Sequence, residues 1–225
     1  MEASLGLFIP LMILESVKTG FDEGVFILCF LDHKPLTVDL SYLDPPFNEI
    51  DYWCSGRDFS SDEEASLSFA ASCCGAQKRA LDLVHRAEQT RQGLTYKLER
   101  KGWDAYCVKA VVSRFTALEL VSDARYARLW LRTRLDRKGG KAYTPRALLG
   151  SLLGRGISRT IAGEALRETL NPEAEAGLLN RFLEAQGDQV PGEEGKHSFL
   201  RNRLRYEGFS VEIINQLFEL APKFG

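Results

Sequence analysis

The sequence predicts a mainly α-helical protein: tandem three-helix repeats of helix-turn-helix type in an elongated curved row, preceded by a small N-terminal β segment. The main observation is one sequence frame that occurs three times, with offsets of 54 and 52 residues between copies. A second observation is an amphipathic helical pattern in front of each copy. A third is a pair of short apolar runs near the N-terminus, separated by a turn signal.

The N-terminal segment, residues 1–60, differs in pattern from the rest of the chain. Phe8–Leu14 and Val25–Leu31 are apolar runs with Lys18-Thr19-Gly20 between them, and residues 36–40 alternate partly between apolar and polar. Short apolar runs separated by turn residues are typical of strands, so we expect two or three strands in a hairpin or meander. Pro45-Pro46 and the polar residues 60–64 interrupt this pattern. We therefore place a boundary near residue 60.

The repeated frame consists of two leucines four residues apart and a glycine four residues further on. Leucines at this spacing lie on one helix face, and a glycine at the end of a helix accepts the left-handed backbone that stops it. The three copies are Leu94-x3-Leu98-x3-Gly102, Leu148-x3-Leu152-x3-Gly156 and Leu200-x3-Leu204-x3-Gly208. Each copy therefore predicts one helix with a glycine stop.

The residues after each glycine predict a second helix. The first is aromatic or branched and is expected to pack into the core, and the second is of a type that caps helices by accepting free backbone N–H groups. These pairs are Trp103-Asp104, Ile157-Ser158 and Phe209-Ser210. In copy two, Thr144-Pro145 also combines a capping residue with a proline at the first helical position.

Another helix is predicted in front of each pair, which makes three helices in a unit. Apolar residues follow helical spacing in 173–185 and 123–138, and copy one has candidates in 62–73 and 77–89. The predicted organisation is residues 1–60 as the β segment and 61–118, 119–171 and 172–225 as helical repeats one, two and three. Residues 187–195 are rich in glycine and acids and are expected to form a flexible linker.

Composition excludes several classes of protein. The chain is 44% hydrophobic and 27% charged, which suits a soluble protein. It has no run of about 18 apolar residues that could span a membrane, and its apolar start lacks the basic leader of a signal peptide. Five cysteines, an odd number, favour a reducing compartment, so we expect a cytoplasmic location. No cysteine or histidine cluster has metal-ligand spacing, and we expect neither a metal nor a cofactor.

Positive charge is concentrated in the middle of the chain. The net charge is −2, yet residues 125–159 contain ten basic residues and one acid, a local charge of +9 that leaves −11 elsewhere. Such a segment can contact a phosphate backbone or an acidic protein groove, although a solvated helix face has the same appearance. The candidate contact residues are Arg125, Arg128, Arg132, Arg134, Arg137, Lys138, Lys141, Arg146, Arg155 and Arg159.

The helical wheel separates these basic residues into two groups. At about 100° per residue, Arg125, Arg128 and Arg132 lie within about 60° of each other, opposite the apolar side of the helix. Arg134 and Arg137 fall on the apolar side, where we expect them to bond local carbonyls or acids instead. Leu129 lies beside the basic stripe, and an apolar residue there favours contact with a protein over contact with phosphate.

Three segments of the chain, in order, resemble one known protein family. Residues 80–103, with Thr90, Leu94, Leu98 and Gly102-Trp103, resemble the family's first repeat. Residues 120–134, LVSDARYARLWLRTR, are similar to its most distinctive stretch, although Ser122 replaces one acid of the usual pair. Residues 204–214 resemble its final repeat. The family that these segments resemble is RecX, the modulators of the RecA recombinase. The resemblance covers about residues 77–220 and leaves residues 1–60 unmatched.

The resemblance implies a function without chemistry. RecX-like proteins bind along the RecA–single-stranded DNA filament, lie in its groove and limit filament growth, ATP hydrolysis and strand exchange. The expected partners are the RecA filament and single-stranded DNA, contacted directly or through the filament, with no membrane and no small-molecule substrate. The wider setting that the resemblance implies is DNA repair by homologous recombination and the SOS response. The basic residues above are assigned by the charge pattern and not by the family.

Two other classes of protein remain open from the residues alone. Short helices joined by glycine turns also occur in stand-alone helix-turn-helix DNA-binding regulators, although no helix here has the Asn, Gln and Arg mixture that reads bases well. An enzyme would need carboxylates such as Asp104, Asp123 and Glu164 to be catalytic. Asp104 is better explained as a helix cap and Asp123 as a helix-start acid, and the sequence has no P-loop, GxSxG, HExxH or dinucleotide motif. We therefore expect no enzyme.

Overall fold

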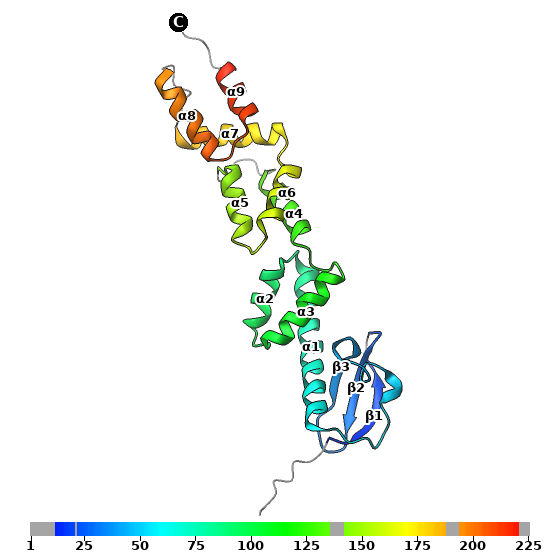
Figure 1. Cartoon of the computed structure of the whole chain (residues 1–225). Coiled ribbons are helices and arrows are strands. Elements are labelled where there is room, and N and C mark those ends of the chain that lie inside the picture. Colours follow the sequence, from blue (N-terminus) through cyan, green and yellow to red (C-terminus); the bar gives the residue numbers. More distant parts are fainter. Residues whose placement is uncertain (1–11, 21, 136–141, 188–193, 221–225) are drawn as a thin grey trace, which may run out of the picture. The chain divides into compact units, whose positions relative to one another are not determined.

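The computed structural model describes residues 12–20, 22–135, 142–187 and 194–220 (Figure 1). Two compact units divide the chain. The first comprises the described residues up to Ala87 together with Leu94–Val121, and the second comprises Glu88–Gly93 and the described residues from Ser122 onward. Within the described ranges, a small sheet is followed by α-helices in three sets of three, so the predicted mainly α fold with an N-terminal β segment is confirmed.

The first unit opens with a three-stranded antiparallel sheet of order β1-β2-β3. Its strands are β1 (Leu14–Thr19), β2 (Val25–Phe30) and β3 (Leu36–Asp39), with Val17 opposite Leu28 and Ile27 opposite Thr37. One face is buried, and Leu14, Leu28 and Val38 have no exposed surface. The predicted meander is confirmed.

The first strand lies later in the chain than the sequence predicted. Most of the predicted strand Phe8–Leu14 falls outside the described residues, and Lys18-Thr19, predicted as a turn, continue β1. A strand with one buried face alternates polar and apolar side chains, so the polar residues Ser16 and Lys18 do not end it. The chain turns further on, where the Gly20 N–H donates to the Val25 carbonyl at 2.7 Å and Gly24 has a φ of 79°.

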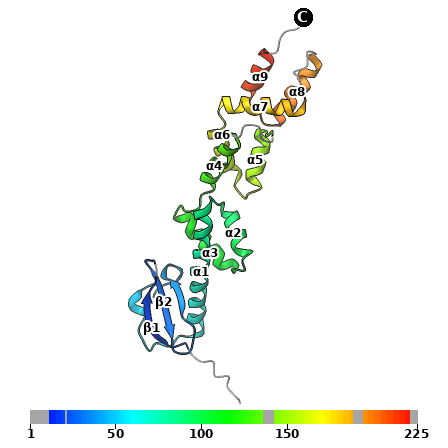
Figure 2. The same ribbon diagram turned by 180° about the vertical axis from the view of Figure 1, so that it is seen from behind.

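Helix α1 (Ser61–Arg86) lies along the sheet in two opposite views (Figures 1 and 2). Ser60 and Glu63 start it with a capping box, in which the Ser60 N–H donates to Glu63 Oε2 at 2.7 Å. Hydrogen bonding from the Ser60 backbone holds the pKa of Glu63 below its ordinary value. Leu67 and Ala70 of α1 pack on Leu14, Leu28 and Phe59 in one apolar cluster.

Copy one has a single front helix, as the three-helix unit predicts. The two candidate segments, 62–73 and 77–89, are joined in this one helix, α1. Gly75 lies between them but does not break the helix. A Cβ on Gly75 would lie 2.6 Å from a ring carbon of Trp103, so this glycine makes room for the indole ring that follows the glycine stop Gly102. Close packing, and not backbone conformation, accounts for glycine here.

The first unit is completed by α2 (Arg91–Glu99), whose first residues belong to the second unit, and α3 (Ala105–Ala117). Leu94 and Leu98, the leucines of the frame, are fully buried against Cys73 and Val111. Burial raises the pKa of the Cys73 thiol well above its ordinary value. All five cysteines are described and none forms a disulfide.

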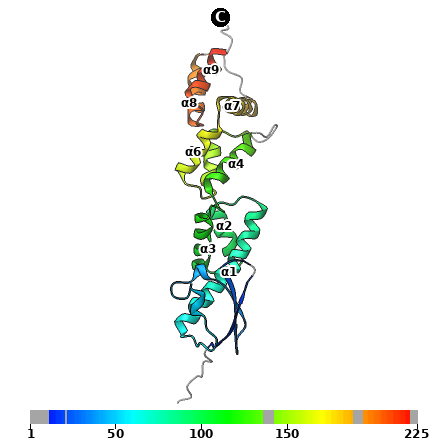
Figure 3. The same ribbon diagram turned by 90° about the vertical axis from the view of Figure 1, so that its right-hand side faces the viewer.

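In the described residues of the second unit, six complete helices surround one apolar core. They are α4 (Asp123–Leu135), α5 (Pro145–Leu153), α6 (Arg159–Thr169), α7 (Pro172–Gln186), α8 (Glu194–Tyr206) and α9 (Val211–Leu220). Helix α7 runs across α8 and α9, which is visible in two views at right angles (Figures 1 and 3). Leu131, Leu148, Leu152, Leu178 and Leu204 share the core of this unit.

The glycine stops of the frame are confirmed in all three copies. Gly102, Gly156 and Gly208 have φ of 88°, 78° and 87°, in the left-handed region that favours glycine. The residues behind them pack inward: Ile157 and Phe209 are buried and Trp103 is half-buried. These glycines end α2, α5 and α8 at equivalent places.

The predicted helix caps are also confirmed. Asp104 Oδ1 accepts the N–H groups of Tyr106 at 2.8 Å and Cys107 at 3.3 Å. In the other copies the capping hydroxyls belong to Ser158 and Ser210, each accepting an N–H group three residues further on at 3.3 Å. Thr144 caps α5 with Pro145 behind it. Local residue types are therefore sufficient to start and stop these helices.

The front helices of copies two and three follow their predictions. Helix α4 matches the described part of 123–138, and α7 matches 173–185 within one residue at each end. The division into four segments stays a prediction, although α1, α4 and α7 begin within a few residues of the proposed boundaries. The expected acidic linker lies mostly outside the described residues. In the described part of the chain, no helix combines the length and hydropathy needed to cross a membrane.

Candidate partner-binding surface

The arginines of α4 do not form a uniformly free positive stripe. Arg125 Nε donates to Glu88 Oε1 at 2.5 Å, and Arg128 forms an exposed ion pair with Glu168 at 3.3 Å. Arg132 is exposed and has no hydrogen-bond or ion-pair partner among the described residues. Acids distant in sequence therefore neutralise two of the three charges that the wheel predicts on this side.

Arg134 and Arg155 converge on one aromatic ring. Their guanidinium carbons lie 5.0 Å and 4.7 Å from the centre of the Trp130 ring, a cation–π arrangement. Arg155 Nη1 also donates to the Ser151 carbonyl at 2.6 Å. Arg134 was expected to bond carbonyls or acids, and it lies over the indole instead, with its Nε buried and unpaired among the described residues.

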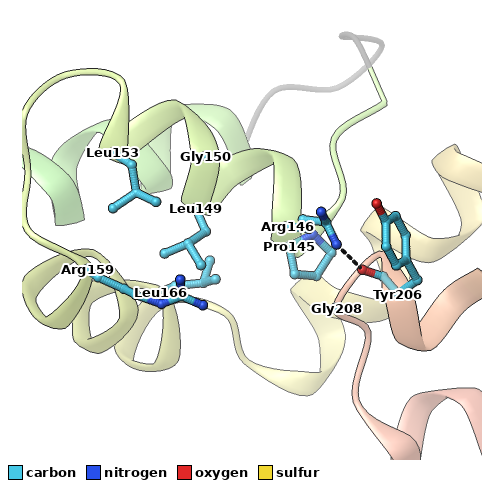
Figure 4. A pocket seen from close by; sticks show the side chains of 9 residues that line it. All are labelled: Pro145, Arg146, Leu149, Gly150, Leu153, Arg159, Leu166, Tyr206 and Gly208. Atoms are coloured by element: carbon cyan, nitrogen blue, oxygen red, sulfur yellow. Dashed lines mark hydrogen bonds between the residues drawn. The ribbon is translucent and has the colours of Figure 1, made fainter.

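Three candidate contact residues lie outside the described residues: Arg137, Lys138 and Lys141. The remaining pair, Arg146 and Arg159, lines a hollow of about 500 Å³ on the second unit (Figure 4). The Arg146 guanidinium stacks on the Tyr206 ring at 3.9 Å and reaches the Tyr206 carbonyl at 3.5 Å. Arg159, the first residue of α6, is exposed and has no partner among the described residues.

The apolar part of this hollow was not predicted from the sequence. Leu149 and Leu153 come from α5 and Leu166 from α6, and Figure 4 shows Leu149 lying between α5 and α6. Leu149 and Leu153 belong to a helix with a regular buried face, so their sequence pattern is indistinguishable from that of core residues. The signal that could have revealed them is a difference between the copies, since the equivalent positions carry polar or charged residues in copies one and three.

Two of the carboxylates considered for catalysis have structural roles, and the third has no partner among the described residues. Asp104 caps α3, and the buried Asp123 accepts the Arg91 N–H at 2.9 Å and Arg91 Nε at 2.8 Å. Glu164 is exposed on α6. Among the described residues, no three His, Cys, Asp or Glu side chains gather as metal ligands would. What the described surface offers is guanidinium groups beside apolar side chains.

Solved structures show the same fold. No protein-family model and no curated protein matches the sequence at a significant level. A crystal structure of the regulatory protein RecX matches with a TM-score of 0.65 and 19% identity, covering 93% of this chain and all of that one. The chain has the RecX fold. RecX from Lactobacillus salivarius matches with a TM-score of 0.51 and 21% identity, covering 67% of this chain and 96% of that one. The RecX fold thus extends over the N-terminal sheet, which the sequence resemblance left unmatched.

Proposed function

We propose that this protein is a RecX-type regulator that binds the RecA–single-stranded DNA filament in the cytoplasm. It mainly inhibits filament extension, ATP hydrolysis and strand exchange, and it does so by binding without catalysis. The observation that carries this proposal is the RecX fold over 93% of the chain. The independent sequence resemblance of residues 77–220 supports it.

The basic residues of copy two supply the electrostatic part of the contact. Arg132 and Arg159 are exposed and unpaired among the described residues, so they can meet an anionic partner without first breaking an internal ion pair. The Arg128–Glu168 pair is exposed on both sides, and such pairs contribute less than about 1 kcal/mol, so Arg128 can exchange partners at low cost. Arg137, Lys138 and Lys141 remain part of the proposed contact.

The direct test follows single-stranded-DNA-dependent ATP hydrolysis by the cognate RecA while this protein is titrated in. We expect inhibition at substoichiometric to equimolar levels. Absence of any effect in that range would contradict the proposal. Selective binding of one duplex sequence without recombinase would favour a stand-alone DNA-binding regulator instead.

A charge reversal locates the contact. Arg132→Glu changes an exposed residue with no partner among the described residues, so weaker inhibition cannot be traced to a broken internal contact. Arg125→Glu and Arg128→Glu are less clean because each places two acids together, with Glu88 and Glu168 respectively. Lys109→Glu is the matched control, since Lys109 is exposed on α3 outside the basic segment. Equal inhibition by Arg132→Glu and the control would remove Arg132 from the contact.

A further inference from the structure

The floor of the hollow on the second unit includes a glycine that the fold does not require. Gly150 lies inside helix α5 and lines the hollow, and a Cβ added to it would meet no atom within 4 Å. A glycine inside a helix costs about 1 kcal/mol relative to alanine. No contact among the described residues requires position 150 to lack a side chain. Because Gly150 has no side chain, the hollow stays open, and no described residue fills it.

The three copies show that this surface is specific to copy two. At the positions of Leu149, Gly150 and Leu153, the same frame carries different residues in the other copies. The equivalents are Thr95, Tyr96 and Glu99 in copy one and Arg201, Asn202 and Arg205 in copy three. Tyr96 is 59% exposed, so the frame accepts a large side chain where copy two has glycine. The bare apolar floor is therefore not a consequence of the repeat.

The charges around the floor are of one sign. Arg146 is held in place by its stack on Tyr206, and Arg159 lies at the start of α6 with its guanidinium unpaired among the described residues. The described residues that line the hollow include no acid. Guanidinium groups bind carboxylates and phosphates with paired hydrogen bonds. The occupant is thus expected to combine an apolar group with negative charge.

An unpaired DNA base fits this surface less well than a peptide side chain. Bases in single-stranded nucleic acid are held mainly by stacking on open aromatic faces. Tyr206 is the one aromatic residue among the described lining residues, and the Arg146 guanidinium lies over its ring at 3.9 Å. The rest of the floor is aliphatic, from Leu149, Leu153 and Leu166. Aliphatic floors accept Leu, Phe or Met side chains by excluding water from both surfaces.

We propose that this hollow is the docking site for an acidic peptide segment of the partner protein that carries a large apolar side chain. The apolar side chain contacts Leu149 and Leu153 over the bare backbone of Gly150, and flanking carboxylates pair with Arg146 and Arg159. The proposal rests on the proposed function only for the identity of the partner. It assigns to copy two a protein contact beside its basic surface.

The test measures peptide binding to the full chain by fluorescence anisotropy, with no recombinase present. The probe is a fluorescein-labelled octapeptide with a central Leu-Phe pair flanked on each side by glutamates. We expect binding that weakens at least about tenfold when Ser-Ser replaces Leu-Phe, the size expected for losing one buried apolar side chain. Arg159→Glu is expected to weaken binding similarly, whereas Lys109→Glu, which changes charge on α3, is expected to leave it unchanged.

Substitutions at Gly150 separate folding from binding. Gly150→Ala and the control Gly177→Ala both remove a helix-interior glycine without a close contact, since a Cβ on Gly177 meets only an Arg181 nitrogen at 3.9 Å. Both are expected to raise the melting temperature, and only Gly150→Ala is expected to weaken the peptide complex. Gly150→Tyr introduces the residue that copy one carries at this place, so it is expected to fold normally and to abolish binding.

The following outcomes would overturn the proposal: no binding of the Leu-Phe peptide, equal binding of the Ser-Ser peptide, or unchanged binding by Gly150→Tyr. An oligo(dT) strand about 12 nucleotides long that binds the parent and loses affinity with the same Gly150 variants would assign the hollow to nucleic acid. The ATP hydrolysis assay is independent of these results. Inhibition of RecA together with failure of the peptide would leave the proposed function intact and remove the docking site.

Discussion

Two junctions inside the second unit join consecutive copies of the frame, and different side chains make the contacts at each. At the first, Thr90 Oγ1 donates to the Arg155 carbonyl at 3.1 Å, and Asp123 accepts both the N–H and the Nε of Arg91. At the second, the Arg146 N–H donates to the Glu207 carbonyl at 3.0 Å, and Thr144 Oγ1 donates to Glu207 Oε2 at 2.8 Å.

Side chains at equivalent positions make different contacts at these two junctions. Gln92 and Arg146 are related by the 54-residue offset. Gln92 packs so closely on the Gly156 turn that a Cβ there would lie 2.1 Å from its side-chain oxygen. Arg146 instead stacks on Tyr206 beside the hollow. The same backbone frame therefore holds one side chain in close contact with the next copy and its equivalent beside an exposed hollow.

The largest expected effect on stability comes from Gly156→Ala at the first junction, where Gln92 packs on the Gly156 turn. Positive φ costs a non-glycine residue about 1–2 kcal/mol, and displacing Gln92 adds a packing cost of about 1 kcal/mol or more. We expect the free energy of unfolding to fall by about 3 kcal/mol, measured by urea denaturation. The control is Gly102→Ala, which has φ of 88° but no atom within 4 Å of the added Cβ and thus carries the backbone cost alone. Equal losses in both variants would show that the Gln92 packing contributes nothing.

A smaller effect is expected from Asp123→Ala at the same junction. Asp123 is only 4% exposed and accepts two hydrogen bonds, one of them from a charged group. Its removal leaves the Arg91 N–H without this acceptor, and because Arg91 is half exposed we expect about 2 kcal/mol of destabilisation. Glu164→Ala, at an exposed acid of α6, serves as control and is expected to change stability by less than about 0.5 kcal/mol. A loss as small as that of the control would mean that water replaces the carboxylate.

The smallest effect on stability is expected from Tyr206→Ala at the second junction, where Arg146 stacks on the Tyr206 ring. Tyr206 is 63% exposed, and an exposed cation–π contact contributes about 0.5–1 kcal/mol. We expect a loss of stability near the lower of these values, together with weaker binding of the acidic peptide because Arg146 is no longer held over the ring. Tyr106→Ala is the matched control, since Tyr106 is 79% exposed on α3. Destabilisation by several kcal/mol would contradict the idea that this junction is an open binding surface.

Local features of the fold were predictable because they depend on residues within one helical turn of each other. The glycine stops at Gly102, Gly156 and Gly208 and the caps at Asp104, Ser158 and Ser210 are examples, confirmed in each copy. Local reasoning does not account for Gly75, where glycine makes room for the ring of Trp103 from a distant part of the sequence. It also placed the first turn too early, because pairing with β2 carries β1 on through Lys18.

The sequence shows where the basic residues are concentrated but not which contacts they make. The sequence showed that positive charge is concentrated in 125–159. It could not show that Glu88 pairs with Arg125 or that Glu168 pairs with Arg128, because 37 and 40 residues separate the partners. The hollow was equally invisible, since Leu149 and Leu153 have the spacing of ordinary core leucines.

By itself, the sequence determined the repeat, the start and stop of each frame helix, and the concentration of basic residues in copy two, all of which follow from residue type and local spacing. The tertiary structure shows which arginines are neutralised, which stack on Trp130 or Tyr206, and that Arg132 and Arg159 have no partner among the described residues. It also decided that the surface of copy two stays bare at Gly150. The physical reason is that hydrogen bonds, ion pairs and ring contacts between helices depend on three-dimensional proximity, which the spacing of residues along one helix does not specify.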